Sequence, residues 1–198
     1  MFTGIIETLG TISEITQEGT NVHFKVKSTI AEELKVDQSV AHNGVCLTVV
    51  SIDDDHHVVT AIDETLKKTD LRNWHVGSKV NIERCMVANG RFDGHVVQGH
   101  VDQIGTVDQI QEQDGSWLYD FSYDPSLGNV TVEKGSITIN GTSLTVVKSE
   151  KGSFSVAIIP YTYEHTNFKS FKKDTVVNLE FDIIGKYVAS YLEQSQNS

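Results

Sequence analysis

The chain has 198 residues, of which 38% are hydrophobic and 22% charged, a composition typical of a soluble globular protein. Its formal net charge of -11 argues against a nucleic-acid partner, because a phosphate backbone is bound by clustered Lys and Arg. No apolar run approaches the roughly 18 residues that a membrane span requires, so we expect no membrane partner.

Two features of the sequence bear on the cellular compartment. No basic region or cleavage site follows Met1, so we expect no secretory signal. Cys46 and Cys85 form no CxxC pair and are too few for a disulfide framework. A reducing, cytoplasmic environment is therefore expected.

Short strands dominate the first half of the chain. Residues 22–26 alternate between apolar and polar side chains, which predicts a half-buried strand. Asn43 and Gly44 predict a tight turn into the apolar, β-branched run of residues 47–50.

The second half of the chain repeats the first. Residues 39–50 match residues 136–147 at seven of twelve positions, 97 residues later. The same spacing carries residues 80–83 onto residues 177–180. Several blocks in one register indicate a tandem duplication rather than chance similarity.

Nearer the start of each copy, the repeat spacing is 95 residues, as Gly4 and Gly99 show. Val22 maps to Tyr119 at the spacing of 97. We therefore expect the two-residue difference in the first hairpin of each copy, near Gly19, where a loop can absorb it.

The many short strands predict an all-β fold in which each copy closes into a barrel. Leu34 and residues 65–74 are expected to form short helices at the barrel ends. After the second copy, apolar residues recur at spacings of three and four between Ile183 and Leu192, which predicts an amphipathic helix. This helix has no counterpart after the first copy, and its apolar face could pack on another subunit or on its own barrel.

Two histidines and one pair of matched residues are the candidates for chemistry. His95 and His100 would face opposite sides of a strand, and their separation suits no common zinc pair, so we expect no metal site. A polar site residue and a structural residue are equally compatible with His100. Cys46 matches Ser143, and the pair could be small residues of a barrel wall or part of two related pockets that differ by one group.

Other polar positions leave similar alternatives open. Ser39 and Ser136 form another matched pair and could be turn hydroxyls. Lys134 could reach a ligand or only solvent. We interpret the basic clusters at residues 67–68 and 169–173 as solvated loop charges.

Five segments together resemble the riboflavin synthase family, in order and over almost the whole chain. These segments are residues 1–6, 39–49, 94–102, 140–146 and 182–187. The chain departs from the family at Asp93, where a glycine is usual, which puts the loop between the barrels in question.

The resemblance implies a tandem duplication of a six-stranded antiparallel β-barrel of the flavin-reductase-like Greek-key type. Residues 1–94 and 95–182 would each form a lumazine-binding barrel, and residues 183–198 a helix that assembles a homotrimer. The implied reaction is the dismutation of two 6,7-dimethyl-8-ribityllumazine molecules, in which a four-carbon unit is transferred to give riboflavin and 5-amino-6-ribitylamino-uracil. No metal or organic cofactor is expected, and lumazine synthase is a conceivable partner.

The resemblance also implies site residues. Those matched to catalytic positions are Ser39, Cys46, His100, Ser143 and Asp182. The expected N-terminal pocket is lined by Gly4, Ile5, Ile6, Cys46, Leu47, Thr48, Thr60, Ala61, Ile62, Asp63, Glu64 and Thr65. The expected C-terminal pocket is lined by Gly99, His100, Val101, Lys134, Ser143, Leu144, Thr145, Ile158, Ile159, Pro160, Tyr161 and Thr162.

Individual roles follow as hypotheses. His100, together with Ser143 or Thr145, would move a proton at the methyl group of the substrate. Ser39 or Cys46 would stabilise or supply a nucleophile.

Two rival functions share the fold. A lumazine protein that serves as an optical antenna would bind the same ligands without chemistry, but the chain keeps the reactive side chains Ser39, Cys46, His100 and Ser143. A flavin reductase would need a nicotinamide-binding βαβ unit after the barrel, and the sequence has none.

Overall fold

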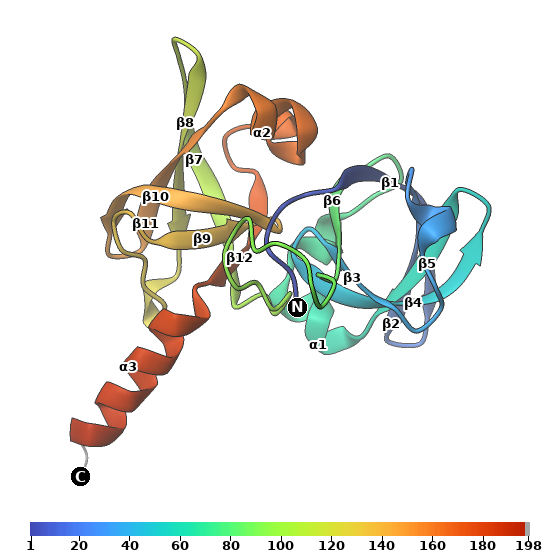
Figure 1. Ribbon diagram of the computed structural model, residues 1–198, viewed down its shortest axis with the longest axis horizontal. Helices are drawn as coiled ribbons and strands as arrows, with labels where there is room; N and C mark the ends of the chain where they lie inside the picture. The colour runs from blue at the N-terminus through green and yellow to red at the C-terminus, as the bar shows by residue number, and fades with distance from the viewer. Residues whose placement is uncertain (197–198) are drawn as a thin grey trace.

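The structure is a computed structural model; it describes residues 1–196 and contains two closed six-stranded antiparallel β-barrels (Figure 1). The first barrel consists of β1 (Thr8–Glu18), β2 (Asn21–Lys27), β3 (Ser39–His42), β4 (Val45–Asp53), β5 (His56–Ala61) and β6 (Lys79–Arg84). The second consists of β7 (Gln103–Gln113), β8 (Ser116–Tyr123), β9 (Ser136–Ile139), β10 (Thr142–Glu150), β11 (Ser153–Ile158) and β12 (Val176–Phe181). Around the first barrel the order is β1-β2-β5-β4-β3-β6, and the second has the matching order, so the predicted barrel duplication is confirmed.

Short helices follow the strands at matching places. The first barrel has the 3₁₀ helices η1 (Ala31–Glu33) and η2 (Asp70–Asn73) and the helix α1 (Asp63–Lys68). The second has η3 (Pro125–Leu127), α2 (Pro160–His165) and η4 (Asn167–Ser170).

The expected helix over residues 65–74 is therefore two helices. Thr69 separates α1 from η2 because its backbone is extended and its hydroxyl accepts a hydrogen bond from the N–H of Leu71. Leu66 of α1, Leu71 of η2 and Trp74 just beyond η2 pack into the core of the first barrel, so these helices lie against that barrel.

The predicted Asn-Gly turns connect β3 to β4 and β9 to β10. The φ angles are 47° and 76° at Asn43 and Gly44, and 44° and 80° at Asn140 and Gly141. Two consecutive positive φ angles fit a two-residue hairpin turn whose twist matches the strands. The two turns touch, since a Cβ on Gly44 would lie 2.7 Å from the backbone nitrogen of Gly141.

In the structure, the two-residue difference between the copies does not lie in the first hairpin. Phe24 of β2 pairs with Ile15 and Val59, and Tyr119 of β8 lies between the matching residues of β7 and β11. Tyr119 is thus the counterpart of Phe24 at a spacing of 95, and the extra residues lie in the connection from β8 to β9. The expected position was wrong because a two-residue shift preserves the alternation of a strand, and the neighbouring Phe121 is also aromatic and buried.

Buried amide side chains join the two barrels. Nδ2 of Asn81 donates to the carbonyl oxygen of Asn140 at 2.8 Å, and Nδ2 of the matching Asn178 donates to that of Asn43 at 2.9 Å. Elsewhere on the interface, the N-terminal segment and the linker between the barrels pair through Phe2 and Val97. The two copies are therefore held in one approximately twofold arrangement by buried, directional contacts.

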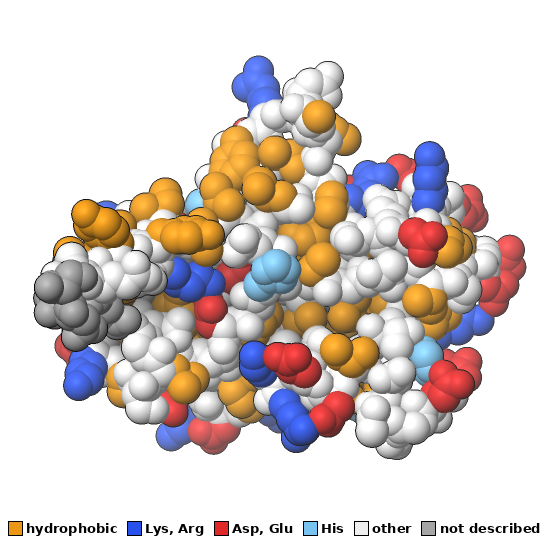
Figure 2. Space-filling view, turned by 90° about the horizontal axis from the view of Figure 1, so that it is seen from below, with side chains coloured by type: hydrophobic (Ala, Val, Ile, Leu, Met, Phe, Trp, Pro, Cys, Tyr) orange, Lys and Arg blue, Asp and Glu red, His pale blue; other side chains and the backbone are white. Residues whose placement is uncertain are grey.

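The predicted tail helix is α3 (Ile183–Gln196), which extends away from the second barrel (Figure 1). Nζ of Lys186 lies 2.8 Å from Oδ2 of Asp102 and ties the first turns of α3 to the barrel. Further along, Tyr187 is 72% and Tyr191 71% exposed. Figure 2 shows hydrophobic side chains gathered beside the end of the molecule that carries the C-terminus. None of the helices within residues 1–196 has the length and apolar character needed to cross a membrane.

Candidate functional site

The strand pairing of each barrel is interrupted at the same place. The pairing of β4 with β5 ends at Val49 and Val59, although β4 begins at Val45 and β5 continues to Ala61. In the second barrel, the pairing of β10 with β11 likewise ends at Val146 and Val156. We call the gap between residues 45–48 and 60–62 the first groove, and the gap between residues 142–145 and 157–159 the second groove. Unpaired strand edges offer backbone donors and acceptors to a ligand.

The side chains at the first groove alternate between inside and outside. Leu47 and Ala61 are buried in the barrel core. Cys46 and Thr60 are half-buried on the outer side, and Ile62 is 54% exposed. The outer side of the first groove therefore carries both polar and apolar side chains.

The second groove repeats this arrangement. Ser143 is half-buried, and Thr145 and Ile159 are exposed on the outer side, while Ile158 is fully buried. Leu144 is half-buried and packs against the core of the second barrel. The structure thus brings together the expected residues of β4 with those of β5, and those of β10 with those of β11.

A glycine-containing segment closes one end of each groove. The N–H of Cys46 donates to the carbonyl oxygen of Gly99 at 2.9 Å, and the N–H of Ser143 donates to that of Gly4 at 2.8 Å. Gly99 and Gly4 have φ angles of 78° and 79°, and a Cβ on either would lie within 2.6 Å of a Cβ in the facing strand. Only glycine fits such a close approach at positive φ.

These contacts place each glycine-containing segment at the groove opposite to the one expected from the sequence. The segment of Gly4, Ile5 and Ile6 lies at the second groove and not beside Cys46. The segment of Gly99, His100 and Val101 lies at the first groove, and Val101 packs against the core of that barrel. The exposed His100 is therefore grouped with Cys46 and not with Ser143 or Thr145.

Two buried glutamates fix the closing segments. Oε1 of Glu83 accepts the N–H of Thr3 at 2.7 Å, and Oε2 accepts that of Gly4 at 3.0 Å. Burial raises the pKa of Glu83, against the effect of these hydrogen bonds. Glu83 thus holds, from the first barrel, the segment that closes the second groove.

Glu180, in the second barrel, holds the segment that closes the first groove. Its carboxylate accepts the N–H groups of Gln98 at 2.6 Å and of Gly99 and His100 at 2.9 Å each. Burial raises the pKa of Glu180 to about 7. Neither glutamate was predicted from the sequence, although the repeated strands that carry them, residues 80–83 and 177–180, contained the signal.

His95, which the sequence offered only as an unsuitable zinc ligand, lies beside the second groove. Nδ1 of His95 lies 2.6 Å from Oγ of Ser143, and its Nε2 lies 3.2 Å from Oγ1 of Thr138. Burial lowers the pKa of His95, and the nearby carboxylate of Asp182 opposes this shift. The second groove therefore has its own titratable group in contact with Ser143.

Cys46 lies near Ser39 at the first groove. Burial raises the pKa of the Cys46 thiol, and the Ser39 hydroxyl partly offsets the shift. The thiol is therefore protonated at neutral pH and is not an activated thiolate.

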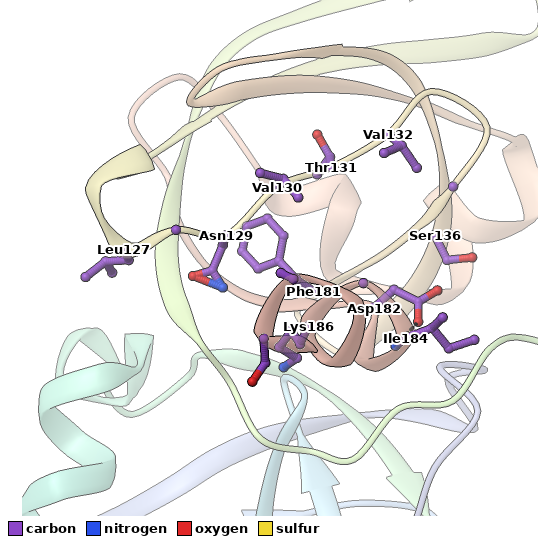
Figure 3. A pocket seen from close by; sticks show the side chains of 15 residues that line it. Leu127, Asn129, Val130, Thr131, Val132, Ser136, Phe181, Asp182, Ile184 and Lys186 are labelled. Atoms are coloured by element: carbon purple, nitrogen blue, oxygen red, sulfur yellow. Dashed lines mark hydrogen bonds between the residues drawn. The ribbon is translucent and has the colours of Figure 1, made fainter. Parts of the chain in front are cut away.

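Asp182 lines a cavity of about 510 Å³ between the connection from β8 to β9 and the first turns of α3 (Figure 3). Ser136 and Lys186 also line it, and Val130 and Val132 face them from the connecting segment (Figure 3). Oδ1 of Asp182 accepts the N–H of Ile184 at 3.0 Å, which begins the helix. In the same connecting segment, Lys134 is exposed and has a φ of 65°.

The remaining expected residues lie on or beside the short helices that follow the grooves. Asp63, Glu64 and Thr65 belong to α1, and Pro160, Tyr161 and Thr162 belong to α2. Asp93, in the linker, does not adopt the positive φ that would require a glycine. Among residues 1–196, no group of three or more His, Cys, Asp and Glu side chains is placed to hold a metal ion.

Comparison with known proteins identifies relatives over the full length. The lumazine binding domain family matches twice, over residues 3–85 and 98–182. The riboflavin synthase of Actinobacillus pleuropneumoniae is 44% identical and covers 97% of this chain and 90% of its own length. That of Bacillus subtilis (strain 168) is 41% identical and covers 100% and 93%.

Solved structures give the same result for the fold. The crystal structure of LumP complexed with 6,7-dimethyl-8-(1'-D-ribityl) lumazine has a TM-score of 0.83 at 25% identity and covers 91% of this chain and 98% of its own. LumP complexed with riboflavin has a TM-score of 0.84 at 26% identity and covers 91% and 99%.

Proposed function

The chain belongs to the riboflavin synthase family of proteins with lumazine-binding domains, and from this premise we propose that it catalyses the dismutation of 6,7-dimethyl-8-ribityllumazine. One substrate molecule gives up a four-carbon unit and becomes 5-amino-6-ribitylamino-uracil. The other accepts this unit and becomes riboflavin.

The duplicated groove is the observation that carries this proposal. The reaction needs two copies of one substrate, and the chain provides two grooves with matched strands, matched glycines and matched glutamates. Holding both substrates in a reactive orientation removes the entropic cost of their encounter, an effect worth several kcal/mol in favourable cases.

A second copy of the chain completes the site in this proposal. Within one chain both grooves are open, with Ile62 54% and Ile159 59% exposed. The first groove of one copy would face the second groove of its neighbour in a homotrimer. The exposed apolar face of α3 would hold the copies together, because an unpaired apolar helix face favours association.

Different residues would act in general acid–base catalysis at the two grooves. His100 would serve the first groove, and His95 would serve the second through Ser143. The protonated thiol of Cys46 would donate a hydrogen bond to the substrate, with Ser39 beside it. We further propose that the protein is cytoplasmic. We also propose that it associates with lumazine synthase.

The test is to incubate the purified chain with 6,7-dimethyl-8-ribityllumazine in the presence of a metal chelator and to follow riboflavin fluorescence. We expect one riboflavin for every two substrate molecules consumed, because the reaction is a dismutation. Tight, fluorescent ligand binding without turnover would contradict the proposal and favour a non-catalytic binding protein, which the similarity to LumP supports as the second candidate.

A further inference from the structure

Three polar side chains form a hydrogen-bonded chain at the edge of the first groove. Nδ1 of His23 lies 2.8 Å from Oγ1 of Thr60, and Nε2 of His23 lies 3.1 Å from Oε2 of Glu18. His23 and Thr60 are direct partners across β2 and β5, which brings their side chains together on the outer face. Thr60 is also the first residue of β5 beyond its last pair with β4, so it stands where the first groove begins.

The carboxylate of Glu18 fixes the tautomer of His23. A carboxylate only accepts hydrogen bonds, so Nε2 of a neutral His23 carries the proton and donates it to Glu18. Nδ1 is then an acceptor, and the hydroxyl of Thr60 donates to it. The two lone pairs of Oγ1 stay free to accept a hydrogen bond from another group.

The second groove has no equivalent of this chain. The place of Thr60 is taken by Ala157, which pairs with Leu118, the counterpart of His23. Gln113 stands at the position of Glu18. The two grooves are therefore matched in backbone but differ at this edge, which is polar in the first and apolar in the second.

We propose that His23 is a positioning residue of the first groove, which turns the Thr60 hydroxyl into an acceptor for a hydrogen-bond donor of the bound substrate. The donor is either the imide N–H of the lumazine ring or a hydroxyl of the ribityl chain. This inference rests on the proposed function. Because only the first groove would accept a hydrogen bond from this donor at Thr60, identical substrate molecules would be held differently in the two grooves.

The test is a fluorescence titration of the full chain with 6,7-dimethyl-8-ribityllumazine, comparing the wild type with Thr60→Val, Thr60→Ser and His23→Leu. Thr60→Val keeps the shape without the hydroxyl and should weaken binding at one class of site about fivefold, as expected for one neutral hydrogen bond. Thr60→Ser should restore the affinity. His23→Leu should weaken binding in the wild type but have no effect when combined with Thr60→Val, because His23 acts only through Thr60.

His56→Leu is the matched control, since it removes a half-buried histidine from the other end of β5, away from the first groove, and it should leave the affinity unchanged. Titration with 6,7,8-trimethyllumazine, which keeps the ring N–H and lacks the hydroxyls, identifies the donor. A loss in Thr60→Val for both ligands assigns the ring N–H, and a loss for the ribityl compound alone assigns a hydroxyl.

Wild-type affinity in both Thr60→Val and His23→Leu would overturn the inference, as would additive losses in the double variant. If the wild type binds the lumazine but forms no riboflavin, the proposed function is wrong. The role of His23 is still tested in that case, because it depends only on how strongly each variant binds the lumazine relative to the wild type. A wild type that does not bind the lumazine would overturn both.

Discussion

The buried carboxylate of Asp70 accepts a hydrogen bond at 2.7 Å from Nδ2 of Asn178, on the opposite barrel. The second barrel has the neutral Asn167 at the matching position. Asn43 also donates to Asp70, at 3.2 Å. Burial nevertheless raises the pKa of Asp70 to about 6. Asp70 is thus an acidic group among the buried amide side chains of Asn43, Asn81, Asn167 and Asn178.

We predict that Asp70→Asn stabilises the protein at pH 8 and has little effect at pH 4. A carboxyl whose pKa rises on folding binds more protons in the folded state, so wild-type stability falls as pH rises from about 4 to about 6. The shift corresponds to at most about 3 kcal/mol. Urea unfolding at several pH values measures the difference, and Asn167→Asp, which adds a second buried acid, should have the opposite effect. Parallel pH profiles of wild type and Asp70→Asn would contradict the prediction.

A second prediction concerns two histidines that are fully buried in the first barrel. Nε2 of His42 lies 2.7 Å from Nε2 of His57, and burial lowers their pKa values to about 3 and about 4. The unfolded chain takes up protons below about pH 6.5 that the folded chain cannot bind, so stability is lost as pH falls. The second barrel has Ile139 and Phe154 at these positions.

The double variant His42→Ile/His57→Phe should therefore lose less stability between pH 7 and pH 5 than the wild type. Fluorescence of Trp74 reports on the first barrel when Trp117 is replaced by Phe, so unfolding of that barrel can be followed separately. The Trp117→Phe protein with both histidines is the control. An equal loss of stability in the two proteins would show that the pair does not set the acid sensitivity.

We predict that Glu180→Gln reduces kcat/KM by about tenfold, a size typical of losing a charged hydrogen-bonding group. A neutral amide has one oxygen in place of two, so it cannot accept all three N–H groups of residues 98–100. The segment that closes the first groove would then loosen from Cys46. Because burial raises the pKa of Glu180 to about 7, wild-type activity should also decline as pH falls through that value.

Steady-state kinetics across pH checks this prediction, with Glu112→Gln on the exposed end of β7 as the control. The Glu180→Gln variant should lack the decline near pH 7 that Glu180 causes. Unchanged kinetics in the variant would show that the closing segment is held by other contacts.

The last prediction concerns the tail helix. Removing the residues after Asp182 deletes the exposed apolar face of α3, so the sedimentation mass should shift from that of the proposed trimer towards that of a monomer. Ligand binding by the first barrel should remain largely intact, because α3 contacts the second barrel. The milder variant Tyr187→Ser/Tyr191→Ser should weaken association in the same direction. If the truncated chain stays trimeric, α3 does not hold the copies together.

Much of the fold was determined by the sequence alone. The repeat, the strand alternation, the Asn43-Gly44 and Asn140-Gly141 turns and the tail helix are local patterns, because each depends on the conformation of a few neighbouring residues. The residues expected to line one pocket together lie on neighbouring strands, β4 with β5 and β10 with β11, and their role in ligand binding stays a prediction.

Only the tertiary structure decided how distant segments combine. Gly4 and Gly99 each reach the barrel opposite to the one expected, because Glu83 and Glu180 hold them across the interface through hydrogen bonds that no local pattern encodes. The position of the two-residue difference was hidden because strand side chains alternate with a period of two. A shift of two residues leaves that alternation unchanged, and only the pairing of Tyr119 with its neighbours on β7 and β11 distinguishes the two alignments.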